Sequence, residues 1–446
     1  MEQQTNTRNP STRRFTFLRR GPLVTLACTM SLALLGACSG GSASPGGSGK
    51  ADGPITVVLL QHWVPEANKY MQKALEDAGK SIGVDVKVNL VAEADLQTRI
   101  TSSMLNDSGP DIVMLRTSMP ILYQSHLADL TDLATELIKR HGDFFEANKQ
   151  QSSVNGRWTA LPLYSVAAFP ILRKDLLDSA GVAIPTTYDE LLAAAKAIKQ
   201  QSGIDGFGTG LSSSRDGILF VQSVLWAFGS QTTAPDGKTV TLDSPETVAA
   251  VEYLKKLYDS GAMPQGVTGW GDSSNNQAYL AGKLGMTTNA PSLYYQLNST
   301  HDPLAAPTVI APWPKGPAGN SPLLDSYGFS ITSYSPRIEK AKELLRKLYA
   351  DDVLQGFYAS GQGFQNATQD YFTKLPVFAA PALAPVLAAL PGARWPGWPG
   401  PSTLKSAEVD NQFVLTDMVT NVLLGRMSPQ ESVTAAKERI SAIYTG

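Results

Sequence analysis

Blocks of apolar and polar residues predict that strands and helices alternate in the first part of the chain. Residues 55–60 form an unbroken aliphatic run with one threonine, which is typical of a buried parallel strand. Residues 84–91 alternate between apolar and polar side chains, and residues 111–115 form a third short strand. The intervening segments 66–80 and 96–105 have helical spacing. This order predicts an open, largely parallel α/β sheet.

Four later helices have clear start signals in the sequence. A Ser or Thr followed three residues later by Glu is a capping box, and a Ser before Pro places a cap ahead of the first helical position. These signals are found at Thr187 with Glu190, Ser428 with Glu431, Ser244 with Pro245, and Ser335 with Pro336. They predict helices near 188–200, 430–444, 246–260 and 337–349.

The first 37 residues have the pattern of a secretory signal peptide. Basic residues precede the apolar run 21–35, which is shorter than the roughly 20 residues that a membrane span needs. Small residues then lead to Cys38, the position of an acylated cysteine in a bacterial lipobox. An ordinary signal peptide or an uncleaved anchor helix are the alternatives. The pair Arg13-Arg14 also leaves twin-arginine export open.

A Ser- and Gly-rich stretch completes segment 38–52, which we interpret as the lipidated Cys38 and a flexible tether. An N-terminal lipid would anchor the protein to the cell membrane on its extracytoplasmic side. The roughly 400 residues beyond the signal peptide exceed one ordinary core, so we expect two domains.

Charge and cysteine content exclude several classes of function. Removing residues 1–37 takes five arginines and one glutamate from totals of 37 basic and 39 acidic residues, leaving a net charge of about −6. No basic run remains to bind nucleic acid. Cys28 leaves with the signal peptide, and the four histidines are scattered without ligand spacing. We therefore expect no metal site and no cofactor.

Several motifs in consistent order resemble one family of proteins. They include Gly109-Pro110-Asp111-Ile112-Val113, Asn155-Gly156-Arg157-Trp158, Thr187-Tyr188-Asp189-Glu190-Leu191, Leu280-Ala281-Gly282-Lys283 and Tyr327-Gly328-Phe329. Together, behind a lipobox, they resemble extracellular solute-binding protein family 1, the sugar-binding partners of ABC importers, with maltose-binding protein among its members. The resemblance implies a two-lobed periplasmic-binding-protein-like α/β fold of class II, whose lobes close on a solute by hinge bending. It places lobe one at 53–162 and 313–361, and lobe two at 163–312 and 362–446.

A sugar has hydroxyls that need hydrogen-bond partners and flat faces that pack on aromatic rings. The carboxyl ends of the predicted parallel strands and the loops that the family places at its cleft supply both kinds of side chain. The candidate ligand-binding residues are Gln61, His62, Trp63, Arg116, Thr117, Ser118, Tyr164, Ser165, Trp226, Trp270, Asn289, Tyr294, Tyr327, Trp395 and Trp398. For Trp226, an apolar setting favours core packing over contact with a ligand.

The resemblance implies a carrier that captures a sugar or oligosaccharide and delivers it to permease subunits, acting as a monomer without catalysis. Ser292 stands where maltose-binding protein has tryptophan, which argues against maltodextrin itself. A phosphorylated polyol or a polyamine remains an alternative ligand, although a polyamine site would need clustered acidic residues and the candidate loops are not especially acidic. An enzyme is a weaker alternative: the G-x-S-x-G at 79–83, which a hydrolase elbow would use, follows a predicted helix instead of a strand. A glycoside-acting enzyme would need two carboxylates facing each other across a cleft.

Overall fold

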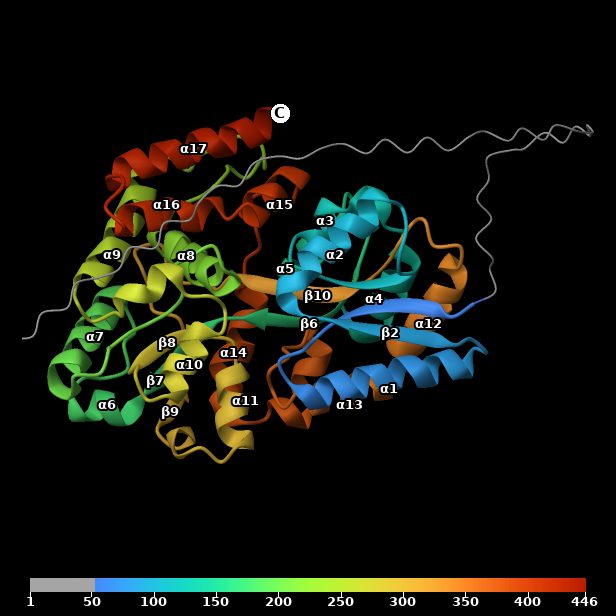
Figure 1. The fold of residues 1–446 in the computed structure, drawn as a ribbon, viewed down its shortest axis with the longest axis horizontal. Helices are drawn as coiled ribbons and strands as arrows, with labels where there is room; N and C mark the ends of the chain where they lie inside the picture. The colour runs from blue at the N-terminus through green and yellow to red at the C-terminus, as the bar shows by residue number, and fades with distance from the viewer. Residues whose placement is uncertain (1–52) are drawn as a thin grey trace, which may run out of the picture. The chain divides into compact units, whose positions relative to one another are not determined.

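The computed structural model describes residues 53–446, and the predicted signal peptide, Cys38 and the tether lie outside the described residues. Within 53–446, no helix is long and apolar enough to cross a membrane. The described chain builds two larger β-sheets, each covered by helices, and a short two-stranded sheet (Figure 1).

The larger sheet has five strands in the order β2-β1-β3-β10-β6. In chain order these are β1 (Ile55–Leu60), β2 (Val86–Val91), β3 (Ile112–Arg116), β6 (Leu161–Ala167) and β10 (Leu324–Ile331). β1 pairs in parallel with β2 and β3, which confirms the three strands predicted from the sequence. β10 runs antiparallel to both β3 and β6, so the sheet is mixed.

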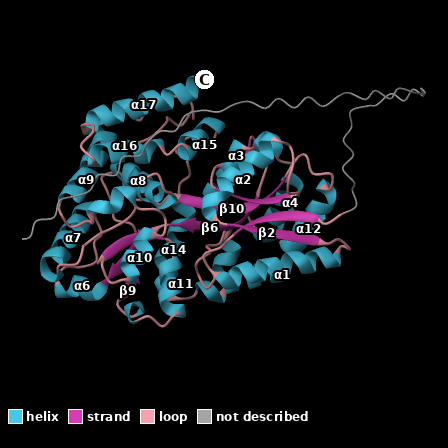
Figure 2. Ribbon diagram, viewed as in Figure 1, coloured by secondary structure: helices cyan, strands magenta, loops and turns pink. Residues whose placement is uncertain are grey.

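Helices cover both faces of this sheet, with α1 on one side and α2 on the other (Figure 2). α1 buries Ala67, Met71 and Leu75, whose spacing of four residues places them on one helical face. The other helices of this region run along the chain as α2 (Glu93–Leu105), α3 (Met119–Leu122), α4 (Thr131–His141), α5 (Glu146–Ser152), α12 (Ile338–Leu348) and α13 (Asp351–Ser360), with α1 at Pro65–Ser81. A short hairpin, β4 (Ser153–Val154) and β5 (Arg157–Trp158), precedes β6.

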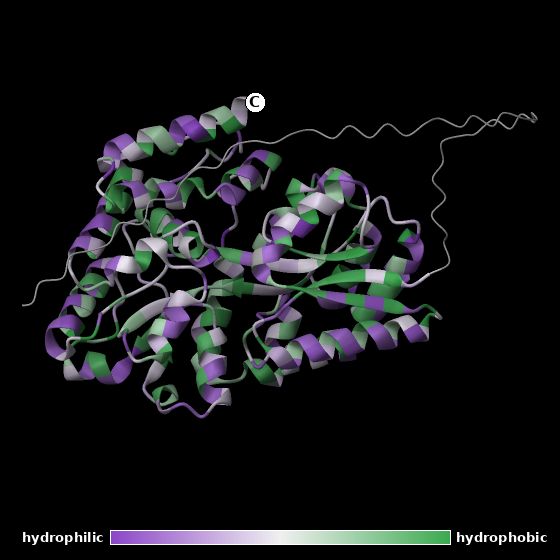
Figure 3. Cartoon of the chain, in the orientation of Figure 1, coloured by the Kyte–Doolittle hydropathy of each residue, from purple (hydrophilic) through white to green (hydrophobic). Residues whose placement is uncertain are grey.

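The smaller sheet has the strand order β8-β7-β9 and is antiparallel. Its strands are β7 (Phe169–Arg173), β8 (Met286–Asn289) and β9 (Thr308–Ile310). Its helices are α6 (Lys174–Ser179), α7 (Tyr188–Ser202), α8 (Arg215–Phe228), α9 (Pro245–Asp259), α10 (Ser274–Leu280), α11 (Ser292–Ser299), α14 (Ala384–Ala389), α15 (Leu404–Asn411), α16 (Val414–Leu423) and α17 (Pro429–Thr445). Outer helices such as α17 mix hydrophilic and hydrophobic residues, whereas the strands are mainly hydrophobic (Figure 3).

The chain passes from one sheet to the other directly, because only Ala168 separates β6 from β7. β6 is buried along its whole length and extends to Ala167, a few residues beyond position 162, where the sequence places the end of lobe one. The exact residues at which one lobe ends and the other begins stay a prediction.

Three of the four predicted helix starts are confirmed. Thr187 and Ser428 form complete capping boxes with their glutamates, and the Ser244 hydroxyl accepts from the backbone of Thr247. The prediction for Ser335 is wrong. α12 begins at Ile338, and the Ser335 hydroxyl lies 2.6 Å from a carboxylate oxygen of Asp111, to which it donates a hydrogen bond. The Ser335 oxygen accepts from the backbone N–H of Arg337 at 3.1 Å, which lies ahead of the first helical residue, so Ser335 binds the chain before the helix instead of capping α12.

Candidate functional site

A small cavity of about 50 Å³ lies between the two sheets. Both sheets and their helices contribute to its wall, so the cavity is assembled from segments far apart in the sequence. Its lining consists of Leu60, Gln61, His62, Trp63, Glu93, Tyr164, Val166, Arg215, Asp216, Leu219, Asp272, Asn276, Asn289, Ala290, Ser292, Asp325, Tyr327 and Phe364.

Trp63 and His62 follow the carboxyl end of β1 and form one wall. Trp63 is 50% exposed, whereas the His62 side chain is buried. The Asn68 side chain fixes the backbone of His62: its amide oxygen accepts from His62 N at 2.7 Å, and its amide nitrogen donates to His62 O at 2.9 Å. His62 Nδ1 accepts from Val64 N at 3.3 Å. Burial lowers the pKa of His62 to about 3, so the ring is neutral and its proton resides on Nε2.

Two stacked tyrosines form the floor of the cavity. The rings of Tyr164 and Tyr327 lie 4.6 Å apart between centroids and are nearly parallel at 12°. The register of β10 against β6 shifts between Tyr327 and Gly328. A Cβ atom at Gly328 would collide with the backbone of Leu161, so only glycine permits this close approach of the strands. Burial raises the pKa of both tyrosines, so their hydroxyls are neutral.

Asp216 and Asp272 form an acidic pair on the opposite wall. Ser214 caps α8 by accepting from Gly217 N at 3.2 Å, which sets Asp216 in the first turn of that helix. The Asp216 N–H donates to Asp272 Oδ1 at 3.0 Å, and Asp216 Oδ2 accepts from Asn275 Nδ2 at 2.9 Å. Burial, and after it the charge of Asp272, raise the pKa of Asp216 to about 8. Asp216 therefore holds a proton over much of the neutral pH range.

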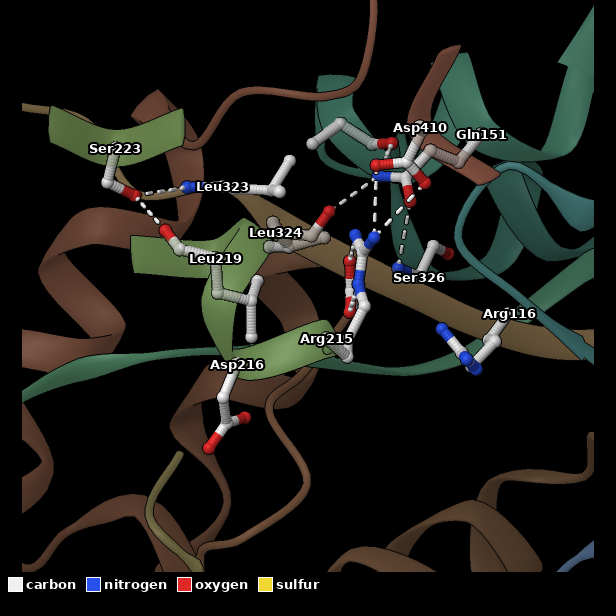
Figure 4. A network of polar contacts seen from close by, with 12 residues as sticks. Arg116, Gln151, Arg215, Asp216, Leu219, Ser223, Leu323, Leu324, Ser326 and Asp410 are labelled. Carbon is white, nitrogen blue, oxygen red and sulfur yellow. Dashed lines mark hydrogen bonds and ion pairs between the residues drawn. The ribbon is translucent and has the colours of Figure 1, made fainter. Parts of the chain in front are cut away.

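Arg215, the residue before Asp216, is fully engaged by two carboxylates. Its Nε donates to Asp325 Oδ2 at 2.6 Å, and its Nη1 donates to Asp410 Oδ1 and Oδ2 at 3.0 and 3.1 Å. Figure 4 shows this network, with the Asp216 carboxylate turned away from the Arg215 guanidinium. Burial raises the pKa of Asp410 although Arg215 opposes that effect.

Arg116 and Glu93 form a second ion pair, with Nε and Oε1 2.6 Å apart. Arg116 is the last residue of β3, and Glu93 begins α2 just after the carboxyl end of β2. Burial raises the pKa of Glu93 against the influence of Arg116. With Arg116 and Arg215 both paired, Asp216 and Asp272 have no basic nitrogen within 4.0 Å among residues 53–446.

Eight of the predicted site residues lie at this cavity or at a smaller one beside it. The six that line the main cavity are Gln61, His62, Trp63, Tyr164, Asn289 and Tyr327. Arg116 and Ser118 line the neighbouring cavity of about 40 Å³, which also contacts Arg215. The polar residue Asn289 is held by side-chain hydrogen bonds with Asn276 and Ser292.

The other predicted site residues lie elsewhere. They are Thr117, Ser165, Trp226, Trp270, Tyr294, Trp395 and Trp398. Trp226 is buried in α8 and meets the edge of Trp398 at 5.9 Å between ring centroids, while Arg394 lies 3.5 Å above Trp398. Ser165 is buried and accepts a hydrogen bond from Asn148 at 2.9 Å. The roles of these residues in binding stay predictions, but their contacts are those of packing.

The sequence analysis missed most of the charged residues at the cavity. Glu93 follows β2 as Trp63 follows β1, so the same strand-end rule would have found it. Arg215 follows three serines that mark a helix start, but nothing local indicates what a helix start will face. The cleft is accordingly more acidic than the candidate loops predict, because Asp216, Asp272 and Glu93 come from segments outside those loops.

Comparison with known proteins gives a consistent result. The sequence profile described as bacterial extracellular solute-binding protein matches residues 63–355. A binding protein of Brucella abortus (strain 2308) is 25% identical over 393 residues, which cover 84% of this chain and 88% of that protein. An ABC transporter-binding protein of Deinococcus radiodurans is 26% identical over 305 residues, covering 66% of this chain and 72% of that protein.

Solved structures with sugars bound have the same fold. A maltose-bound protein of T. maritima matches with a TM-score of 0.77 and 25% identity, covering 88% of this chain and 100% of that chain. A sugar transporter protein of Arthrobacter chlorophenolicus A6 with bound laminaribiose matches with a TM-score of 0.75 and 20% identity, covering 87% and 99%. The two-lobed α/β fold predicted from the sequence is thereby confirmed.

Proposed function

This chain belongs to the bacterial extracellular solute-binding protein family, and from that premise we propose that it captures a sugar or sugar-like polyol for an ABC importer. The observation that carries the proposal is the cavity between the two sheets, where aromatic rings stand beside polar side chains. A neutral carbohydrate needs that combination, since its ring faces pack on aromatics and its hydroxyls need hydrogen-bond partners.

In this proposal, the two lobes close over the solute and bury it. The differential affinity of the solute for the closed form supplies the free energy for closure. Contacts that cross from one lobe to the other support such a closed form. Tyr295 on α11 donates to Glu66 on α1 at 2.8 Å, and Arg215 on α8 holds Asp325 on β10. The closed protein would then be recognised by the permease subunits.

The ligands of the structural neighbours, maltose and laminaribiose, support a carbohydrate over a phosphorylated polyol. A phosphate ester would need basic groups free to pair with it. Arg116 and Arg215, the basic residues at the two cavities, are already paired with carboxylates.

We further propose that Cys38 carries the lipid that anchors the protein outside the cytoplasmic membrane, and that the protein acts as a monomer. The lipobox and the tether in the sequence support the anchor. The main cavity is lined by residues of one chain, which supports the monomer.

The direct test is thermal unfolding of the chain from Ser39 onward against mono- and oligosaccharides, polyols, polyol phosphates and polyamines. A ligand that binds only the folded state adds about 2.7 kcal/mol of stability at a hundredfold excess over its Kd. We expect the melting temperature to rise with one class of carbohydrate or polyol. A rise with phosphate esters alone would contradict the proposed ligand.

A matched pair of variants tests the location of the site. Trp63→Ala removes an exposed aromatic ring at the cavity, and we expect it to weaken sugar affinity about tenfold. Tyr371→Ala removes a comparably exposed ring outside the cavity lining and serves as the control. Equal affinities of the two variants would place the binding site elsewhere.

A further inference from the structure

The carboxylates at the cleft fall into two sets that differ in their partners. Glu93, Asp325 and Asp410 each face a guanidinium group. Asp216 and Asp272 lie beside each other and a backbone N–H, and no basic side chain of residues 53–446 neutralises them. Such a pair inside a small cavity is costly to ionise, since burial and mutual repulsion act in the same direction.

Hydrogen bonds within the protein satisfy only some of the carboxylate oxygens of Asp216 and Asp272. Asp216 Oδ2 accepts from Asn275, and Asp272 Oδ1 accepts from the Asp216 N–H. Figure 4 shows the Asp216 carboxylate directed away from Arg215, the nearest guanidinium in the sequence. The guanidinium of Arg215 donates hydrogen bonds to Asp325 and Asp410. It would lose these hydrogen bonds if it rotated towards Asp216.

A second, independent observation concerns His62. Its ring is 92% buried, it lines the same cavity, and its Nε2 has no hydrogen-bond partner in the described part of the chain. Because Nδ1 accepts from Val64, Nε2 is a donor without an acceptor. Buried donors without partners are rare, and a ligand oxygen would satisfy this one.

We propose that the solute of this cleft is a cationic amine on a polyol or sugar frame, with its ammonium group against Asp216 and Asp272 and an oxygen against His62 Nε2. This inference rests on the proposed function and specifies its ligand. An ammonium group brings a positive charge to the acidic pair and can displace the proton of Asp216, whereas a neutral sugar brings hydroxyl donors and no charge. The exposed ring of Trp63 adds a face that attracts a cation.

Proton linkage gives the inference a second readout. Asp216 faces Asp272 and Asn275 directly, and the charges of Asp325 and Glu93 also act on it. Its pKa of about 8 means that a bound cation must displace a proton at neutral pH. Affinity for an amine that stays charged should therefore rise between pH 6 and pH 8, while affinity for its neutral counterpart should not.

The test is titration calorimetry at pH 7 with amine and hydroxyl members of matched pairs. The pairs are glucosamine with glucose, the β-1,4-linked glucosamine dimer with cellobiose, and 1-amino-1-deoxysorbitol with sorbitol. In at least one pair we expect the amine to bind about tenfold tighter or more than its neutral partner. Asp216→Asn and Asp272→Asn should reduce this preference, and Asp243→Asn, at an exposed carboxylate outside the cavity, should preserve it.

The inference is overturned if each neutral member binds as tightly as its amine, or if no amine in the panel binds. Binding of neutral sugars in either case would leave the proposed function intact. Failure of every sugar and polyol, charged or neutral, would reject the proposed function as well. A preference for amines that persists unchanged in both Asp→Asn variants would also overturn the inference, because the charge would then be recognised elsewhere.

Discussion

Arg215 and Asp216 are neighbours in the sequence, but their side chains meet opposite surroundings. Arg215 is buried with two carboxylates that neutralise it from β10 and α15. Asp216 lies against another carboxylate, Asp272, and no positive charge from the described part of the chain offsets the pair. Both side chains project from the first turn of one helix, so local structure does not account for the contrast.

The difference indicates two uses of buried charge in one cleft. The Arg215 network links elements of the two lobes and is complete within the protein. The acidic pair is incomplete without an outside partner. A complete network stabilises the folded chain when all its members are present, whereas an incomplete one lowers stability and leaves binding energy for a ligand.

The largest effect should come from breaking the complete network. Arg215→Met leaves Asp325 and Asp410 buried without a positive charge, and we expect it to lower the free energy of unfolding by about 3–5 kcal/mol. Urea denaturation measures the loss. Arg439→Met, which breaks an exposed pair with Asp417, should cost no more than about 1 kcal/mol. Equal losses of unfolding free energy in the two variants would show that burial does not strengthen the Arg215 network.

The acidic pair should lower the free energy of unfolding as the pH rises, whereas the Arg215 network raises it. The pKa of Asp216 is raised from 3.8 to about 8, so the folded state holds a proton that the unfolded state releases. Stability from this group is therefore full below about pH 4 and falls as the pH rises towards 8. Compared with Asp216→Asn, the unmodified protein should lose about 3–4 kcal/mol of unfolding free energy between pH 5 and pH 8. Parallel pH profiles for the two proteins would show that Asp216 titrates normally.

A smaller effect is expected at the second ion pair. Glu93 and Arg116 keep 24% and 19% of their side chains exposed, so water can replace either partner. Glu93→Gln should destabilise the protein by about 1 kcal/mol in urea denaturation. A loss as large as that of Arg215→Met would show that removing one member of this pair costs as much free energy of unfolding as breaking the buried Arg215 network.

The smallest effect should come from the exposed contact between Tyr295 on α11 and Glu66 on α1. Tyr295→Phe removes one exposed hydrogen bond from the closed form. We expect ligand affinity to fall less than about fivefold, with faster dissociation in stopped-flow fluorescence. An unchanged dissociation rate would show that this contact does not restrain opening.

Local patterns predicted the elements of the fold well. The three parallel strands and the capping boxes at Thr187 and Ser428 follow from residues that lie close together in sequence. Ser335 shows the limit of that reasoning. Its hydroxyl donates to Asp111, 224 positions away, and accepts from Arg337 N ahead of the helix, so α12 begins later than the local pattern predicts.

The site was predicted only in part, for a related reason. Gln61, His62 and Trp63 were found because a strand end marks the ligand-binding edge of an α/β sheet. Trp395 and Trp398 were expected at the cleft from their aromatic character alone, and the structure places them outside the cavity lining. An aromatic side chain fits a packed interior as well as a sugar face, so its identity does not decide between the two.

The sequence by itself determined the order of strands and helices, the family and the type of fold, because periodicity, caps and ordered motifs are local properties of the chain. Only the tertiary structure decided which charges meet. Electrostatic interactions depend on distance and burial, and the chain brings Arg215 to Asp325 from 110 positions away while leaving Asp216 beside Asp272. The same residue types therefore became a complete network in one place and an unpaired acidic pair in the other.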